Sequence, residues 1–232
     1  MEKKKKIGLI GGISAASTLQ YYKTITDLYY ERRGDYYYPE ILIYSLDFQY
    51  FTDMENQGKK EEYIDYIHAA AEALLNAGAD FIAMAANSPH SVYDEVKKMS
   101  GAEMISIVES AATAAAGAGL KTVLLTGIKY TMQADFYQKG FEKSGINVIT
   151  PAEAHQDEID RMIFDELVIH KFTHETKQRF TEIIKSYNAD GVILGCTELP
   201  LLLKQKDIDI KILDTLSLHC EAILTHALRV AG

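Results

Sequence analysis

The chain has 232 residues, 47% of them hydrophobic, which suits one large globular domain or two small ones. Its formal net charge of −9 argues against nucleic acid as a partner, because phosphate binding needs a basic face. No apolar stretch approaches the ~20 residues that span a bilayer, so we expect no membrane partner. The lysine run at 3–6 leads into a patterned strand without a cleavage signal, and we therefore expect a soluble cytoplasmic protein.

Short apolar runs alternate with longer stretches at helical spacing along the whole chain. The runs are almost continuously apolar, as in strands that are covered on both faces. Between two of them, residues 60–78 carry apolar side chains every three to four positions, which predicts an amphipathic helix. The alternation predicts an α/β fold with parallel sheets and right-handed crossovers. The predicted strands are residues 7–10, 41–46, 81–85, 104–108, 123–127, 147–150, 191–195 and 211–213.

The sequence contains an internal repeat. The segment ADFIAMAANSP at 79–89 aligns without a gap on ADGVILGCTEL at 189–199. A weaker repeat pairs IGLIGG at 7–12 with VLLTG at 123–127, each an apolar run that ends in glycine. The repeats predict that the chain consists of two similar halves.

We predict two Rossmann-like parallel-sheet halves. The first comprises residues 1–112 with a C-terminal helix at 215–232, and the second comprises residues 113–209. The repeat aligns Ala86 of the first half with Cys196 of the second. Because ligands bind beyond the carboxyl ends of parallel strands, we expect the active site in a cleft between the halves.

The segment GCTELP at 195–200 predicts a reactive thiol. Cys196 ends a buried strand just before a helix, where backbone N–H groups and the helix dipole lower the pKa of a cysteine. A thiolate there can act as a base or a nucleophile. Cys220 lies on the apolar face of the last predicted helix and is expected to be a buried structural thiol. The two cysteines show neither disulfide nor metal-ligand spacing, so we expect free thiols.

The stretch MAANSPH at 84–90 leaves two interpretations open. Ser88 can cap a helix and Pro89 suits the first helical position, which explains both without any function. Alternatively, Asn87 and Ser88 present hydrogen-bond donors to the carboxylate of a ligand. The side chain of Ala86, at the turn itself, can neither accept nor donate a proton.

The glycine-rich stretch GLIGGISAAST at 8–18 also follows a predicted strand. Its glycines do not have the spacing of a dinucleotide-binding fingerprint. The turn around Gly12 can cradle an anion at a helix N-terminus, or it can be a tight turn with Ser14 or Ser17 as the cap.

Two further turns carry polar residues that can cap a helix or contact a ligand. In TGIKYTM at 126–132, Thr131 is either a helix cap or a ligand donor. In DTLSLH at 214–219, Asp214 is expected to cap the final helix and His219 to be structural. The histidines show no metal-ligand spacing, so we expect no metal site.

Taken together, these segments resemble the cofactor-independent aspartate/glutamate racemase superfamily, over nearly the whole chain. Glu198 is typical of its aspartate racemase branch. The resemblance implies that one cysteine from each half flanks the Cα of the substrate, without pyridoxal phosphate or metal, commonly in a homodimer. The matching segments are IGLIGGISAAST (7–18), SLDF (45–48), NSPH (87–90), GIKYTMQADFY (127–137), GCTELP (195–200) and DTLSLH (214–219).

The chain departs from the superfamily at its first cysteine motif. That motif is usually cysteine-Asn-Thr-x-His, whereas residues 86–90 read Ala-Asn-Ser-Pro-His. Some relatives carry threonine at this position, so a natural loss is one explanation of Ala86 and an engineered replacement is the other. The segments where the resemblance places a residue for the distal carboxylate are DFQYFTD (47–53) and DELVIHK (165–171). They contain one basic side chain with a permanent charge, Lys171.

We therefore predict an amino-acid racemase-family enzyme without cofactor, acting on aspartate, glutamate or a close analogue. Cys196 is the predicted acid/base, and Ala86 occupies the position of the usual second cysteine. The alternatives are a single-cysteine decarboxylase or isomerase of a small dicarboxylate, and a non-catalytic sensor of an acidic amino acid. The predicted substrate-binding residues are Gly12, Ser14, Gln49, Asn87, Ser88, Thr131, Thr197 and Glu198.

Overall fold

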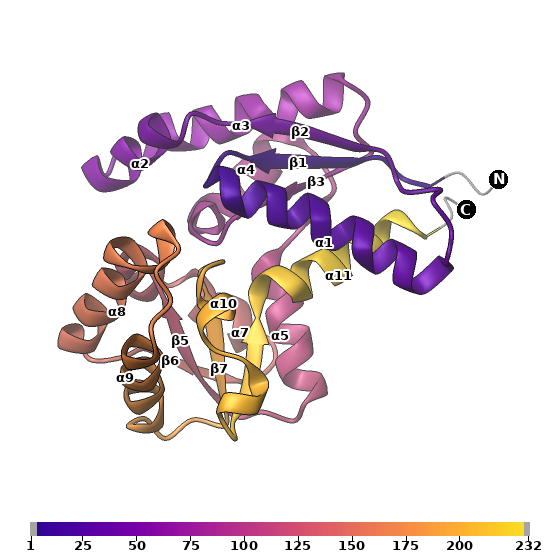
Figure 1. Cartoon of the computed structure of the whole chain (residues 1–232). Coiled ribbons are helices and arrows are strands. Elements are labelled where there is room, and N and C mark those ends of the chain that lie inside the picture. Colours follow the sequence, from indigo (N-terminus) through magenta and orange to yellow (C-terminus); the bar gives the residue numbers. More distant parts are fainter. Residues whose placement is uncertain (1–3, 230–232) are drawn as a thin grey trace. The chain divides into compact units, whose positions relative to one another are not determined.

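The computed structural model describes residues 4–229, which fold into two compact units. The first unit comprises Met1–Ile107 and His219–Gly232, and the second comprises Val108–Leu218. Each unit contains a four-stranded parallel sheet with helices packed on it (Figure 1). The predicted α/β class with two parallel-sheet halves is confirmed.

The sheet of the first unit has the strand order β2-β1-β3-β4. Helix α3 packs against β1, β2 and β3, and Figure 1 shows α1 on the other side of this sheet. Ile67 and Leu74 of α3 meet Ile10 and Ile82 of the sheet in one buried cluster, as the helical spacing of 60–78 predicts. The elements are β1 (Ile7–Gly11), α1 (Ala15–Arg33), β2 (Ile41–Ser45), α2 (Phe48–Gln57), α3 (Lys60–Asn76), β3 (Phe81–Met84), the 3₁₀ helix η1 (Ser88–Val92), α4 (Tyr93–Ser100) and β4 (Met104–Ile105).

The sheet of the second unit has the strand order β6-β5-β7-β8. Helix α8 packs on β5 and α7 on β6, and Leu124 and Val192 of the sheet share a buried cluster with Ile159 and Phe180. Helix α11 (Thr215–Ala227) leads the chain back into the first unit. The remaining elements are α5 (Ile107–Gly117), β5 (Thr122–Gly127), α6 (Lys129–Gln133), α7 (Phe136–Glu142), β6 (Asn147–Ile149), α8 (Glu153–Asp165), η2 (Leu167–Ile169), α9 (His174–Lys185), β7 (Gly191–Gly195), α10 (Leu199–Leu202), η3 (Gln205–Asp207) and β8 (Lys211–Asp214).

One predicted strand is shorter than its apolar run. The run 104–108 was expected to be a strand, but β4 ends at Ile105 and α5 begins at Ile107. Ile107 and Val108 are both buried. A continuous apolar run therefore marks burial here, and it does not separate a strand from the first turn of a buried helix.

The internal repeat has a structural cause at the amino ends of the strands. Asp80 accepts a hydrogen bond from the backbone N–H of Lys6 at 2.6 Å. Its counterpart Asp190 accepts hydrogen bonds from the N–H groups of Lys121 and Thr122, both at 2.9 Å. In each unit one aspartate thus ties the start of one central strand to its neighbour.

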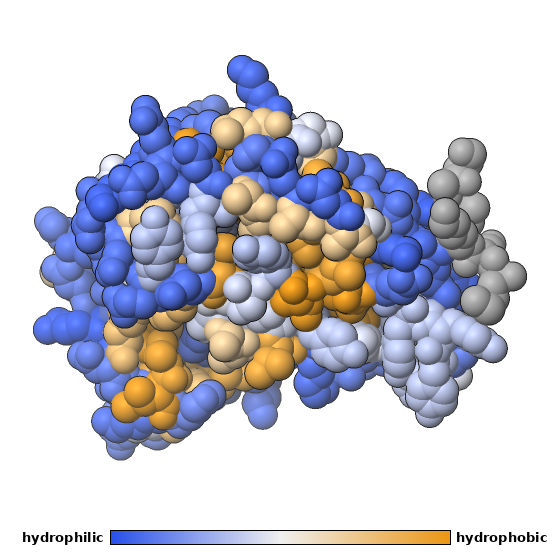
Figure 2. All heavy atoms as spheres, turned by 90° about the horizontal axis from the view of Figure 1, so that it is seen from above, coloured by the Kyte–Doolittle hydropathy of each residue, from blue (hydrophilic) through white to orange (hydrophobic). Residues whose placement is uncertain are grey.

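The edge strand β2 is the most exposed part of the first sheet. Its outer edge has no partner strand among the described residues, and Ile43 and Tyr44 are more than 40% exposed. Figure 2 shows hydrophobic atoms gathered near the middle of the upper face, where Figure 1 places β2 and α3. Exposed apolar patches of this kind are typical of contact surfaces. The other exposed apolar side chains on α1, the loop after it and α2 are Leu19, Tyr22, Tyr30, Tyr36, Tyr37, Tyr38, Phe48 and Tyr50.

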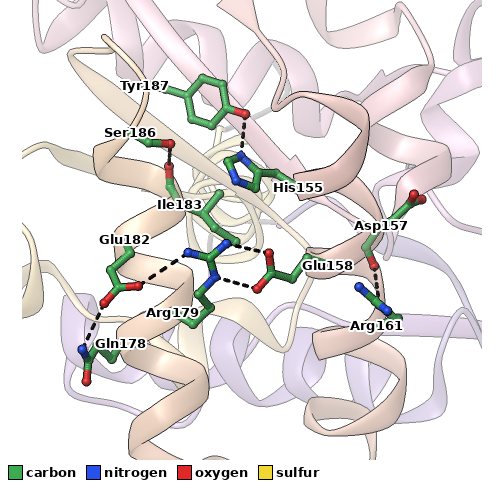
Figure 3. Close-up of polar contacts among 10 residues, drawn as sticks. All are labelled: His155, Asp157, Glu158, Arg161, Gln178, Arg179, Glu182, Ile183, Ser186 and Tyr187. Carbon is green, nitrogen blue, oxygen red and sulfur yellow. Dashed lines mark hydrogen bonds and ion pairs between the residues drawn. The ribbon is translucent and has the colours of Figure 1, made fainter.

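A polar network joins α8 to α9 on the surface of the second unit (Figure 3). The guanidinium of Arg179 forms a fork with the carboxylate of Glu158, with N–O distances of 2.6 and 2.9 Å, and also contacts Glu182 at 3.6 Å. In a separate contact, Nδ1 of His155 on α8 lies 2.8 Å from the hydroxyl of Tyr187, just after α9. These contacts connect α8 to α9, and α8 also forms hydrogen bonds to Lys129, at the start of the helix that carries Thr131.

Candidate active site

The turn after β1 is shaped by Gly12. Its φ of +86° and the backbone oxygen of Leu46, 2.3 Å from where a Cβ would lie, leave room for glycine alone. Its N–H donates to the hydroxyl of Thr18 at 2.8 Å, so this amide does not serve an anion. Ser14 caps α1 by accepting a hydrogen bond from the N–H of Ser17 at 3.4 Å, which confirms the capping interpretation.

The turn after β3 is buried, and His90 fixes its shape. Ala86, Asn87, Ser88 and His90 are each less than 8% exposed. The N–H of Ile107 donates to Nε2 of His90 at 3.1 Å, so the ring proton lies on Nδ1 and is donated to the carbonyl of Ala86 at 3.0 Å. Both ring nitrogens are therefore committed to the backbone, and His90 does not provide a base for chemistry.

His219 is a second buried structural histidine, as predicted. Its Nε2 donates to the carbonyl of Ile105 at 3.0 Å, and its Nδ1 accepts from the hydroxyl of Tyr21 at 2.9 Å. Burial lowers the pKa of His219 to about 4. Burial, and then the neighbouring His219, lower the pKa of His90 to about 3.

We expect these two histidines to make the fold less stable in mild acid. In the unfolded chain these two histidines bind protons near pH ~6.5, whereas in the folded chain His219 does so at about pH 4 and His90 at about pH 3. The contribution of these histidines to the free energy of unfolding should thus be complete above pH ~6.5. It should decrease as the pH falls below this value, by up to about 1.4 kcal/mol per pH unit for each histidine. Urea denaturation at pH 7, 6 and 5 measures this slope. Replacing His219 by glutamine should make the slope shallower, and an unchanged stability between pH 7 and 5 would contradict the assignment.

Ser88 does not cap a helix, contrary to one of the two sequence interpretations. It begins the 3₁₀ helix η1, at whose start no side chain caps the backbone. The carboxyl group of Glu55 from α2 accepts a hydrogen bond from the hydroxyl of Tyr63 at 2.7 Å, and the hydroxyls of Ser88 and Tyr63 both lower the pKa of this carboxyl group. Burial raises the pKa of Glu55 above its usual value, and the two hydroxyl donors offset only part of this effect. The turn after β3 therefore has a titratable carboxyl group beside it.

In the second unit, Cys196 follows β7 directly and is partly buried. Its Sγ lies 2.9 Å from Oε2 of Glu198, and the hydroxyl of Thr197 donates to the same oxygen at 2.8 Å. Burial, and then the charge and hydrogen bond of Glu198, raise the pKa of the Cys196 thiol well above its usual value. The expectation of a lowered pKa was wrong. Backbone N–H groups of Thr197 and Glu198 do act in the expected direction, but burial and the carboxylate outweigh them.

This arrangement makes the thiol the resting form and Glu198 its proton acceptor. Replacing Glu198 by glutamine should lower the pKa of Cys196, because it removes the negative charge that disfavours the thiolate. The pH dependence of alkylation by iodoacetamide measures this, with Cys196→Ala as the background that leaves only the buried Cys220. An alkylation midpoint that stays in place or rises in Glu198→Gln would show that the carboxylate does not control the thiol.

Thr131 lies on α6, beside the paired ends of β5 and β7. Gly127 and Gly195 lie opposite each other there, and a Cβ on Gly195 would come within 2.7 Å of a backbone oxygen and 3.5 Å of the methyl of Thr131. Thr131 lies inside α6 and is not its cap, so the capping interpretation was wrong. Its hydroxyl is buried and has no hydrogen-bond partner. A buried hydroxyl without a partner is costly unless a ligand satisfies it.

Helix α8 fixes the position of this turn. Asp160 accepts a hydrogen bond from the N–H of Lys129 at 2.6 Å, and Asp157 accepts one from its ammonium group at 2.5 Å. The ammonium of Lys129 is therefore already paired beside Thr131. Lys171 is exposed after η2, and the amide of Gln49 donates to Asp53 on the surface of α2 at 2.8 Å. The geometry assigns neither residue to a substrate carboxylate.

Asp214 and Cys220 have the structural roles that the sequence predicts. Asp214 caps α11, since its carboxylate accepts from the N–H of Ser217 at 3.2 Å and from its hydroxyl at 2.7 Å. Cys220 is fully buried, as expected of a structural thiol. Glu55 was missed by sequence reasoning, because it lies 33 residues before Ser88 and no local pattern marks it.

Comparison with known proteins identifies the family. The sequence profile of the Asp/Glu/Hydantoin racemase family matches residues 10–223. The chain belongs to this family. A member with a curated description, the broad specificity amino-acid racemase RacX of Bacillus subtilis (strain 168), is 28% identical over 90% of this chain and 92% of its own length.

Solved structures agree with this racemase family. An aspartate racemase homologue from Pyrococcus horikoshii OT3 has 39% identity and a TM-score of 0.87, over 97% of this chain and 100% of that chain. The aspartate racemase of Picrophilus torridus shares the fold, with a TM-score of 0.79 at 21% identity over 98% of this chain and 96% of that one. Within residues 4–229, no helix combines the length and apolar content needed to cross a membrane.

Proposed function

We propose that the protein is an amino-acid racemase-family enzyme that moves the Cα proton of aspartate, glutamate or a close analogue without pyridoxal phosphate. The observation that carries the proposal is the thiol of Cys196, 2.9 Å from the carboxylate of Glu198 at the end of β7. A thiol and a carboxylate in direct contact form an acid/base pair. Family membership and relatives described as an aspartate racemase homologue and as a broad specificity amino-acid racemase support an amino-acid substrate.

The chemistry begins with the thiol, which is the resting form. When the ammonium group of a substrate approaches, its positive charge favours the thiolate, and the thiol proton passes to Glu198. The thiolate then removes the proton from Cα, and the electron pair of the broken C–H bond moves into the substrate carboxylate as an enolate. Return of a proton from Cys196 to the same face completes an exchange without inversion.

Hydroxyl groups of the second unit are proposed to bind the substrate carboxylate. Of these hydroxyl groups, that of Thr131 is the best candidate, because it is buried without a hydrogen-bond partner. An enolate oxygen of the substrate would supply the acceptor that it lacks. The hydroxyl of Thr197 already donates to Glu198 and is proposed to orient that carboxylate. In the first unit, Asn87 and Ser88 remain proposed contacts, whereas the Gly12 amide, Ser14 and Gln49 already form hydrogen bonds within the protein.

Ala86 supports a second candidate function. A decarboxylase or isomerase of a small dicarboxylate needs to protonate an enediolate on one face alone, and a single cysteine suffices for that. Incubation with each enantiomer of aspartate and glutamate in deuterium oxide separates the candidates. Racemase chemistry deuterates Cα, decarboxylation releases carbon dioxide, and binding without either reaction indicates a sensor.

The proposal includes a homodimer. The exposed apolar side chains of α1, β2 and α2 in the first unit offer a surface for a second copy, rich in the tyrosines that are enriched at interfaces. Light scattering at micromolar protein should give twice the chain mass of 26.0 kDa. A mass of one chain would reject the dimer.

A further inference from the structure

Helix α6 is too short to hold its own position in the second unit. It has five residues, Lys129–Gln133, whereas isolated helices shorter than about 12 residues are marginal in water. The residue at its N-cap, Ile128, has an apolar side chain and forms no capping hydrogen bond. The carboxylate of Asp160 on α8 accepts a hydrogen bond from the N–H of Lys129 at 2.6 Å instead. Asp160 therefore caps α6 from a neighbouring helix and places an acidic side chain at its positive end.

Thr131 lies within this short helix, and its two side-chain groups have different surroundings. Its methyl lies 3.5 Å from where a Cβ on Gly127 or on Gly195 would be, so it packs toward the paired ends of β5 and β7. A threonine inside a helix can donate its hydroxyl to the carbonyl four residues earlier, but the buried hydroxyl of Thr131 has no hydrogen-bond partner. Gly195 directly precedes Cys196. The free hydroxyl therefore lies at the strand ends from which the thiol follows.

We propose that Asp160 is a positioning residue of the reaction, which caps α6 and thereby holds the hydroxyl of Thr131 where it binds the substrate carboxylate. Asp160, Thr131 and Cys196 all belong to the second unit. In this role Asp160 acts through Thr131 and does not contact the substrate. The inference rests on the proposed function, in which Thr131 binds the carboxylate, and it adds the residue on which that contact depends.

Asp157, three residues earlier on α8, has a different role. Its carboxylate accepts a hydrogen bond from the ammonium group of Lys129 at 2.5 Å, and a carboxylate oxygen of Glu153 lies 3.6 Å from the same ammonium group. These contacts end at a long, partly exposed side chain, where ion pairs contribute little to stability. The contact from Asp160 ends at the backbone of α6. It is therefore the contact that sets the position of this helix.

The test follows deuterium incorporation at Cα for D- and L-aspartate and D- and L-glutamate. Asp160→Ala removes the acceptor and should slow exchange at least about tenfold, because an oxyanion donor that is out of place loses much of its ~10² to 10³-fold contribution. Asp160→Asn keeps an oxygen acceptor, and since asparagine caps helices about as well as aspartate, its rate should stay within about threefold. Asp165→Ala, which removes an exposed carboxylate from the end of α8, is the matched control and should not change the rate.

A double-mutant cycle separates positioning from a general effect on the fold. Thr131→Val removes the hydroxyl but keeps the shape of the side chain, and it should itself slow exchange at least about tenfold. If Asp160 acts through Thr131, adding Asp160→Ala to Thr131→Val should slow exchange no further. Backbone amide exchange across residues 129–133 should become faster in Asp160→Ala and stay unchanged in Asp160→Asn and Asp165→Ala.

Three results would overturn the inference. The first is exchange at Cα in Asp160→Ala as fast as in Asp165→Ala, and the second is a double variant in which the two losses multiply. The third is unchanged protection of the amides at 129–133 in Asp160→Ala, a readout that needs no substrate. Failure of the proposed function is a different result, namely that Cys196→Ala exchanges both enantiomers as fast as the unmodified protein.

Discussion

Replacing Cys196 by alanine should abolish exchange of the Cα proton in one enantiomer of the substrate. In the proposed mechanism, the Cys196 thiol at the end of β7 removes the Cα proton of the substrate, and Glu198 acts only through this thiol. A positioned acid/base group contributes about 10² to 10⁴-fold in rate, so a loss of at least this size is expected. Proton NMR in deuterium oxide measures the rate directly.

Cys220→Ala is the matched control for this change. It also removes one sulfur atom, but from the fully buried face of α11, and it should leave the exchange rate unchanged. Equal rates in Cys196→Ala and the unmodified protein would remove the basis of the proposed function. A loss in both variants would point to damage to the fold, which melting temperatures of the two variants would reveal.

Replacing Ala86 by cysteine should increase racemisation by about 10² to 10⁴-fold. The change adds one sulfur atom at the turn after β3, in the position that the internal repeat aligns with Cys196. A thiol is a far better proton donor and acceptor near neutral pH than a hydroxyl or a methyl group. The rate of inversion of each pure enantiomer, followed by polarimetry, gives the result.

Ala86→Ser provides the comparison for size and polarity. It adds an atom at the same site without a thiol, so racemisation should stay near the level of the unmodified protein, and binding should change little in either variant. If serine and cysteine at position 86 give equal rates, acid/base chemistry at this position does not limit the reaction.

The sequence predicted the architecture because burial leaves a direct pattern. Continuous apolar runs marked the eight strands, and the repeat of ADFIAMAANSP and ADGVILGCTEL marked the two halves. The same signal failed at residues 104–108, where a buried run passes from a strand into α5 within two residues. Periodicity reports how deeply a residue is buried more reliably than it reports backbone conformation.

Electrostatics of the site were less predictable from sequence. The helix-start position of Cys196 predicted a lowered pKa, but burial of the thiol, and then Glu198 two residues later at 2.9 Å, raise it. Likewise, burial raises the pKa of Glu55 on α2, whereas the hydroxyls of Ser88 and Tyr63 lower it, and no sequence spacing marks these neighbours. The sign of a pKa shift depends on which side chain reaches the group, and this requires the coordinates.

The most direct test of the account is to incubate the unmodified protein with each pure enantiomer of aspartate and glutamate in deuterium oxide. Deuterium at Cα is followed by NMR and inversion by chiral chromatography. Because Cys196 serves one face and Ala86 supplies no thiol for the other, one enantiomer should gain deuterium faster than it inverts, and faster than its mirror image. Equal rates of exchange and inversion for both enantiomers, or binding without exchange of either, would contradict the account.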